Sequence, residues 1–163
     1  MDRINILSKN IEEMKVSKYI IFMGLIGFFW SVLFSNIVYF IAGADISKEY
    51  YQSDDVILST IISAIIISPF IETLFFQALP LSLAKPYKIK IGYKIMISAF
   101  CFALIHIIYN IFYAGSAFFI GVILAYSFVL YDKKKGNPIL VVTLVHSLIN
   151  LLSLVTRQAL SNS

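Results

Sequence analysis

Charged residues are scarce in this chain, and their scarcity limits the class of protein. Asp, Glu, Lys and Arg make up 13% of the 163 residues, whereas hydrophobic residues make up 60%. A soluble domain is nearer one quarter charged and one half apolar. Disordered chains, coiled coils and nucleic-acid-binding modules need far more polar sequence, so we expect no nucleic-acid partner. The composition instead predicts an integral membrane protein.

Cysteine and histidine are also rare. The single cysteine, Cys101, cannot form an internal disulfide, which excludes a disulfide-stabilised scaffold. The chain has two histidines and nine acidic residues. With so few of these groups, any that falls inside an apolar segment is a candidate for function.

Long apolar runs make up most of the sequence. A membrane-spanning helix needs about 20 mostly apolar residues, and helices satisfy their own backbone groups in lipid. The sequence therefore predicts an all-α, polytopic transmembrane bundle over residues 19–156, with an N-terminal segment (1–18) and a C-terminal tail (157–163). The five predicted spans cover residues 19–42, 56–84, 91–113, 116–131 and 138–155.

The basic residues indicate how the chain crosses the membrane. All but two of the 13 Lys and Arg lie before the first span, around the loop after the second (with Lys94 just inside the third span) or after the fourth; the exceptions are Lys48 and Arg157. By the positive-inside rule, the N-terminus is cytoplasmic and the C-terminus is outside. A composition rich in Ile, Lys, Phe and Tyr is typical of an AT-rich bacterial genome, so we expect a bacterial plasma membrane. The small residues at 42–44 leave signal-peptide cleavage as an alternative.

Three ionisable side chains interrupt the apolar spans. Glu72 lies in the second span, His106 in the third and His146 in the fifth. A charge at the bilayer centre costs roughly 2.5–3.5 kcal/mol on insertion scales and usually marks a functional pathway. At about 1.5 Å per residue, all three lie within roughly 10 Å of the midplane. They could therefore converge in one pocket.

Each of these residues also has a simpler explanation. A lone histidine in a membrane often hydrogen-bonds a neighbouring helix, and Glu72 could be a neutral packing residue. Asn110, one turn after His106, is interpreted as structural or interfacial. Three independent explanations are needed if the groups are unrelated, so their coincidence favours a shared site.

Three short motifs, in order along the chain, resemble those of a known family. Residues 68–78 resemble the E-E-x-x-x-R motif of the CAAX prenyl protease and bacteriocin-processing (CPBP, or Abi) family. The pair Phe102 and His106 matches its F-x-x-x-H motif, and His146 with Asn150 matches H-x-x-x-N. The resemblance covers about residues 56–155.

The resemblance implies an intramembrane endopeptidase that acts on a membrane-associated or lipidated peptide. Carried over to this chain, Glu72 would be the general base and His106 would help to hold the water. His146 and Asn150 would stabilise the oxyanion. This mechanism needs no cofactor, although a Glu/His/His set could also bind zinc.

The first motif departs from the family pattern at two positions. Thr73 stands in place of the second Glu, and Gln77 in place of the Arg. Our hypothesis is that a Thr–Gln hydrogen bond replaces a Glu–Arg ion pair, because losing both charges together avoids leaving one of them unpaired. Thr73, Gln77 and Phe102 are thus predicted supporting residues.

Two other functions stay open at this point. A non-catalytic family member could bind a bacteriocin-like peptide and confer immunity, and a proton relay could use Glu72 with the histidines. The expected partners are membrane lipid and a peptide or protein substrate. The sequence does not predict an oligomeric state.

Overall fold

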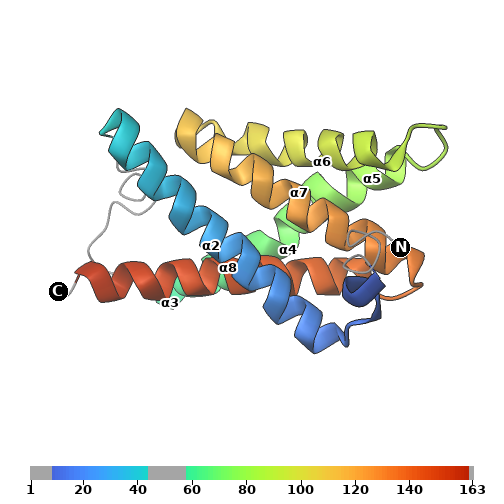
Figure 1. Ribbon diagram of the computed structural model, residues 1–163, viewed down its shortest axis with the longest axis horizontal. Helices are drawn as coiled ribbons and strands as arrows, with labels where there is room; N and C mark the ends of the chain where they lie inside the picture. Colours follow the sequence, from blue (N-terminus) through green and yellow to red (C-terminus); the bar gives the residue numbers. More distant parts are fainter. Residues whose placement is uncertain (1–8, 44–57, 162–163) are drawn as a thin grey trace.

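The structure is a computed structural model that describes residues 9–43 and 58–161. Every regular element in these two ranges is a helix (Figure 1). A short helical stretch over residues 9–13 precedes the first long helix. The elements that follow are α2 (Val16–Ala42), α3 (Leu58–Ile62), η1 (Ser63–Ile67), α4 (Ser68–Glu72), η2 (Thr73–Ala78), α5 (Leu79–Leu83), α6 (Ile91–His106), α7 (Ile111–Lys133) and α8 (Pro138–Ser161).

The length and apolarity of these helices confirm the predicted all-α polytopic bundle. Within residues 9–43 and 58–161, four helices are long and apolar enough to cross a membrane: Val16–Ala42, Leu58–Leu83, Ile111–Lys133 and Pro138–Ala159. The remaining predicted span, the third, corresponds to α6, which is shorter but also apolar. The last helix continues to Ser161, through most of the segment that we expected to be a tail.

The predicted boundary between the third and fourth spans is wrong. The third span was expected to run through residue 113, but α6 ends at His106 and α7 begins at Ile111. Asn110 has an extended backbone, and its side-chain oxygen accepts a hydrogen bond of 2.7 Å from the N–H of Phe112. This cap starts α7, which agrees with the structural interpretation of Asn110. Hydropathy could not place the turn, because the sequence is apolar on both sides of it.

The second span is one continuous helix that widens twice. Its two π-helical turns, η1 and η2, end two residues before Pro69 and Pro80 respectively. A proline has no N–H, and its ring displaces the carbonyl four residues earlier, so a helix must kink or widen there. Glu72 is the last residue of α4, between the two widened turns. We call residues 58–83 the segmented helix.

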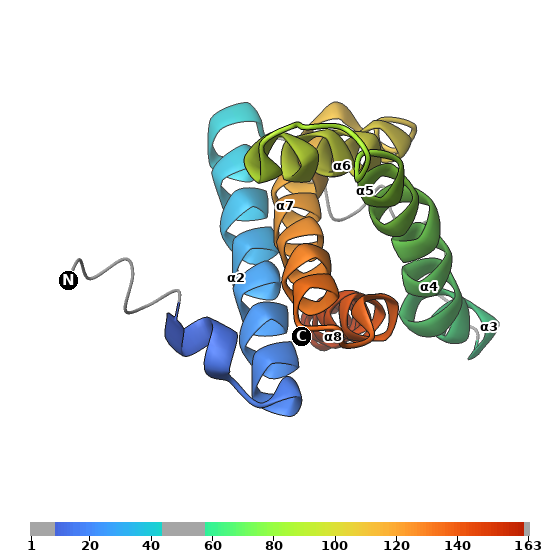
Figure 2. The same ribbon diagram turned by 90° about the vertical axis from the view of Figure 1, so that its right-hand side faces the viewer.

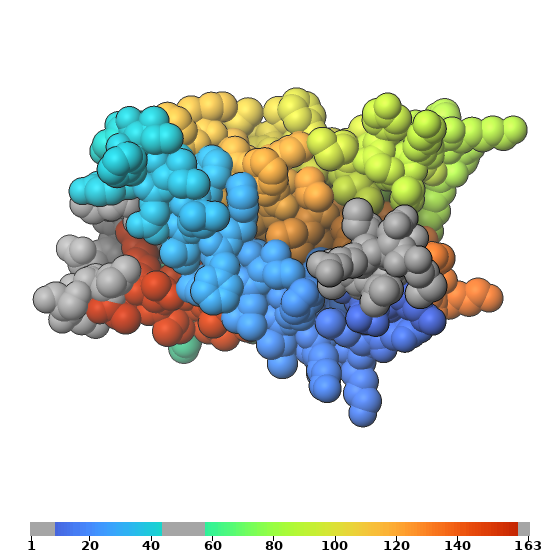
Figure 3. All heavy atoms as spheres, in the orientation of Figure 1, coloured from blue at the N-terminus to red at the C-terminus, as the bar shows by residue number. Residues whose placement is uncertain are grey.

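The segmented helix bridges two parts of the bundle. Its first half lies along α8 and its second half along α6, as Figures 1 and 2 show. The helices α6 and α7 form an antiparallel pair, packed closely where Gly121 meets Ala99. On the face seen in Figure 3, α2 lies across α7 and α8. Glu72 is therefore carried between two helices that each hold a histidine.

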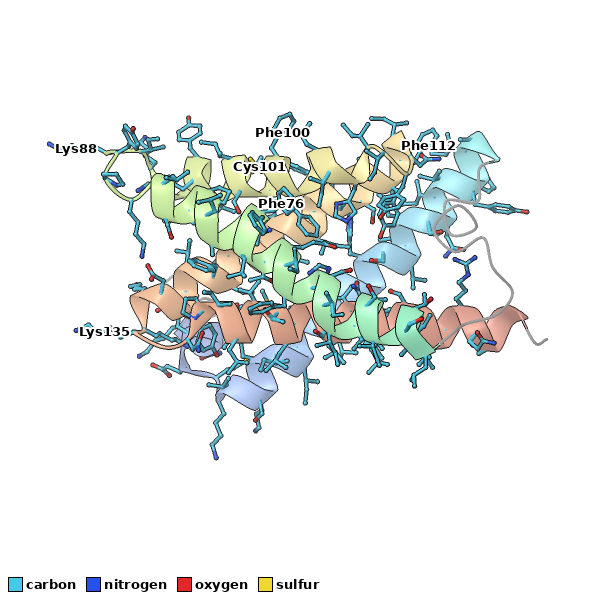
Figure 4. The ribbon with its side chains drawn as sticks, turned by 180° about the vertical axis from the view of Figure 1, so that it is seen from behind. Phe76, Lys88, Phe100, Cys101, Phe112 and Lys135 are labelled. Carbon is cyan, nitrogen blue, oxygen red and sulfur yellow. The ribbon has the colours of Figure 1, made fainter. Side chains whose placement is uncertain are left out.

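The basic turns lie together at one end of the molecule. Lys88, between α5 and α6, and Lys135, between α7 and α8, are at the same end in Figure 4, whereas Phe112 is near the other. Lys85 Nζ forms a salt bridge of 2.9 Å with Asp132 Oδ2, which joins the two turns. This is the arrangement that the alternation of charge along the sequence predicts.

Candidate active site

Glu72, His106 and His146 meet at one point in the bundle. The Oε2 atom of Glu72 lies 3.8 Å from Nε2 of His106 and 3.8 Å from Nε2 of His146. The Glu72 side chain is 18% exposed, whereas those of His106 and His146 are 7% and 5% exposed. Three helices distant in sequence thus bring one carboxylate and two imidazoles into a largely apolar environment, as the sequence suggested.

The spacing within this group suits a small bridging molecule. A distance of 3.8 Å is too long for a direct hydrogen bond. Glu72 Oε2 is buried and has no hydrogen-bond partner among the described residues. Polar groups at such a separation are often bridged by water. The carboxylate and the two ring nitrogens can therefore act together on one bound molecule.

The tautomer of His106 follows from its backbone contact. Its Nδ1 lies 2.7 Å from the carbonyl oxygen of Phe102. A carbonyl only accepts hydrogen bonds, so Nδ1 must carry the proton. In the neutral ring, Nε2 then has a lone pair, and it faces the Glu72 carboxylate. His106 can therefore accept a hydrogen bond from a molecule bound between the two.

His146 has different surroundings. Its Nδ1 is buried and makes no hydrogen bond within the part of the chain that the structure describes. Its Nε2 is the atom that faces Glu72. The ring of Phe102 lies against both imidazoles, with centroids 4.6 Å from His106 and 5.5 Å from His146. Phe102 is 2% exposed, so it fixes the positions of the two rings by packing.

Asn150 connects α8 to the segmented helix. It lies one turn after His146, and its Nδ2 donates a hydrogen bond of 2.9 Å to the carbonyl of Ala64 in η1. The bond joins residues 86 positions apart in sequence. This contact uses one N–H of the amide. The predicted role of Asn150 at the oxyanion would therefore use the other N–H.

The structure contradicts the predicted hydrogen bond between Thr73 and Gln77. Both side chains are fully buried, but Thr73 Oγ1 and Gln77 Nε2 have no partner among the described residues. Gln77 Oε1 instead lies 2.6 Å from Ser98 Oγ on α6. The reason is local geometry: both residues belong to the widened turn η2, where Gln77 faces α6.

Sequence reasoning missed Ser98, although a signal for it was present. Ser98, Phe102 and His106 are spaced four apart and therefore share one face of α6. Ser98 is fully buried and contacts the turn that follows Glu72. A polar residue on the same face as a motif histidine was the observation that could have identified it.

The zinc alternative also involves these residues. Within residues 9–43 and 58–161, no three His, Cys, Asp or Glu side chains have the arrangement of a metal site. The donor types at Glu72, His106 and His146 would still suit zinc.

The comparison with protein families gives a match that covers the candidate site. The sequence profile of the type II CAAX prenyl endopeptidase Rce1-like family matches residues 54–152. Neither the curated proteins nor the solved structures gave a match. The matched segment is more than half of the chain and contains the carboxylate and both imidazoles. The chain therefore belongs to the type II CAAX prenyl endopeptidase Rce1-like family, within the CPBP proteins that its motifs resemble.

Proposed function

We propose that this protein is an intramembrane endopeptidase that hydrolyses a peptide bond of a membrane-associated or lipidated peptide, using a water molecule activated by Glu72. One observation carries the proposal: Glu72 Oε2 is 3.8 Å from Nε2 of both histidines. Membership of a CAAX endopeptidase family supports the reaction class.

The hydrogen-bonding capacity of the group suits a nucleophilic water. Glu72 Oε2 and the lone pair on His106 Nε2 are both acceptors, so each can take one hydrogen of the same water. The water oxygen then presents its lone pairs to the carbonyl carbon of the substrate. As the C–O bond forms, one proton passes to Glu72, which acts as the general base.

His146 and Asn150 would act on the substrate oxygen. With its proton on Nε2, His146 can donate to the oxyanion of the tetrahedral intermediate, and the second N–H of the Asn150 amide is a further donor. Donors fixed in place are worth a few kcal/mol each where water is scarce. When the C–N bond breaks, Glu72 returns its proton to the leaving nitrogen, which completes the hydrolysis.

The two departures from the family motif support a second candidate. Thr73 and Gln77 carry no charge, so the ion pair of the E-E-x-x-x-R pattern is missing. A chain that has lost this pair could retain peptide binding and bacteriocin immunity without cleavage. The two candidates differ in whether Glu72 is needed for chemistry or only for folding.

The test compares Glu72→Gln with the wild type in liposomes that contain a fluorogenic lipidated peptide. The variant keeps size and polarity but is no base, so we expect cleavage to fall at least 100-fold, a typical loss for a catalytic acid or base. Glu13→Gln is the matched control, because Glu13 is 65% exposed and belongs to the N-terminal helical stretch, which carries none of the site residues. Neither EDTA nor 1,10-phenanthroline should change the wild-type rate.

Two results would contradict the proposal. A Glu72→Gln variant with wild-type activity would remove the base. A wild-type protein that binds the peptide but does not cleave it, with binding unchanged in the variant, would favour the non-catalytic immunity function.

A further inference from the structure

Near Pro69 and Pro80, the segmented helix has carbonyl groups that lack their usual backbone donors. Side chains from two other helices donate hydrogen bonds to two of these carbonyls. Asn150 on α8 donates to the carbonyl of Ala64 at 2.9 Å. Ser98 on α6 donates to the carbonyl of Phe76 at 2.8 Å. These contacts lie on either side of Glu72, and each comes from a helix that also carries a site histidine.

The backbone register explains why these carbonyls are available. In η1 the N–H of Ser68 bonds the carbonyl of Ser63, five residues back. The next donor in that register is Pro69, which has no N–H to offer to Ala64. In η2 the N–H of Leu79 bonds the carbonyl of Leu74, so Pro80 is the missing donor of Phe75 in that register. Phe76 is four residues before Pro80, so the same proline also removes its α-helical donor. A buried carbonyl without a donor is costly.

The hydroxyl of Ser98 has two neighbours but only one hydrogen. Its Oγ lies 2.8 Å from the Phe76 carbonyl and 2.6 Å from Gln77 Oε1. The carbonyl can only accept, so we assign the hydroxyl hydrogen to it. The amide of Gln77 then satisfies the network best with Nε2 towards Ser98, since the N and O of an amide are assigned from such contacts. This orientation gives Gln77 Nε2 the partner that it otherwise lacks.

We propose that Ser98 is a positioning residue for Glu72: by holding the Phe76 carbonyl and the Gln77 amide, it fixes the widened turn η2 and thereby the carboxylate in front of the two imidazoles. This inference rests on the proposed function. Closing a π-turn to an α-turn changes the register by one residue, which rotates the flanking helix by about 100°. Such a slip would carry Glu72 away from both histidines.

The two contacts divide this task between the helices that hold the imidazoles. Asn150 secures the turn before Glu72 from α8, and Ser98 secures the turn after it from α6. Ser98 is fully buried and two turns before His106, so it is rigidly placed with respect to that ring. The position of the carboxylate is thus set by the same elements that set the positions of the rings.

The experiment compares Ser98→Ala and Ser98→Thr with Ser127→Ala. Ser127 is a matched control, because its hydroxyl is also fully buried but bonds the carbonyl of Ile123 in α7 and the hydroxyl of Tyr19 in α2, neither of which belongs to the segmented helix. We expect Ser98→Ala to lower kcat about tenfold or more with KM within about twofold, because the slip affects the base and not the substrate contacts. Ser98→Thr should recover most of the rate, and Ser127→Ala should keep it.

A second readout does not depend on activity. The chain has only two histidines, so ¹⁵N-histidine NMR resolves the two site rings directly. Ser98→Ala should shift both Nε2 resonances in the direction that Glu72→Gln shifts them, and Ser127→Ala should not. If Ser98→Ala fails to fold, Ser98→Cys, with a similar size and a weaker donor, replaces it.

The outcomes separate this inference from the proposed function. A wild-type protein without cleavage would refute the protease, while the imidazole resonances would still test the role of Ser98. Wild-type resonances and a wild-type kcat in Ser98→Ala would overturn the positioning role and leave the protease intact. An equal loss in Ser98→Ala and Ser127→Ala would show a general effect on folding and would also overturn it.

Discussion

Thr73 and Gln77 replace the second Glu and the Arg of the E-E-x-x-x-R motif by uncharged side chains. In the family pattern these positions hold a Glu and an Arg; here both are neutral and fully buried. The two neutral residues do not bond one another, since Gln77 contacts Ser98 instead. The lost ion pair has thus been replaced by a contact to a different helix.

Restoring the charges one at a time gives a prediction for this pair. Gln77→Arg should destabilise the protein by about 3–5 kcal/mol, because an unpaired charge would be buried. Adding Thr73→Glu should recover much of this loss, because it places an opposite charge in the same buried turn η2. The measurement is thermal unfolding in detergent for the single and double variants. Equal stability of the two variants would show that the positions do not couple.

For single residues, the sequence identified the rare ionisable side chains of the site but missed a common polar one. Glu72, His106 and His146 stood out because ionisable residues are costly in lipid. Ser98 did not, because serine is unremarkable in a membrane helix. The Thr73–Gln77 hydrogen bond was wrong because helical spacing assumes an α-helix, and the segment is a π-turn.

Among the elements, the pair of α6 and α7 depends on one glycine. A Cβ built on Gly121 would lie 2.9 Å from Ala99 Cα and 3.1 Å from its carbonyl oxygen. Both atoms belong to the backbone and cannot turn away, so the helices would have to separate. Small residues commonly allow such close approach in membranes.

The corresponding prediction uses two glycines. Gly121→Ala should lower the free energy of unfolding by about 1–3 kcal/mol through overpacking. Gly92→Ala is the control, because nothing lies within 4 Å of its added Cβ and alanine favours a helix. Unfolding of both variants in the same detergent tests the difference. A Gly121→Ala variant as stable as Gly92→Ala would contradict the close approach.

The widened turn η2 gives a second prediction at the scale of elements. If Pro80 is the reason that Phe76 needs Ser98, Pro80→Ala should make Ser98 less important. Ser98→Ala should cost about 1 kcal/mol in the wild-type background, as for one buried hydrogen bond, and clearly less beside Pro80→Ala. A double-mutant cycle of unfolding free energies measures this coupling. Additive effects of the two substitutions would show that the proline and the serine act independently.

The presence of the helices was easier to predict from the sequence than their exact ends and their widened turns. Apolar length located all five apolar helices, because the bilayer sets their lengths. The turn before α7 was missed because its start depends on one capping side chain, Asn110, within a continuous apolar run. The widened turns depend on which carbonyls the prolines release, and hydropathy contains no information on that.

At the scale of the whole molecule, the clustering of basic residues at one end predicts how the protein is oriented across the membrane. Lys85 and Asp132 join the two basic turns, and the start of α2 lies at the same end (Figures 1 and 2). The positive-inside rule assigns such an end to the cytoplasm. In that orientation the turn between α6 and α7 and the end of α8 face the outside.

Cysteine labelling in intact cells tests this orientation in a Cys101→Ser background. Lys88→Cys lies at the basic end, and Ile108→Cys lies in the opposite turn at a residue that is 80% exposed. A membrane-impermeant maleimide should label Ile108→Cys from outside, and label Lys88→Cys only after the membrane is opened. Both variants should react in permeabilised cells, which controls for access. The reverse pattern would place the basic turns outside and contradict the orientation that the positive-inside rule assigns.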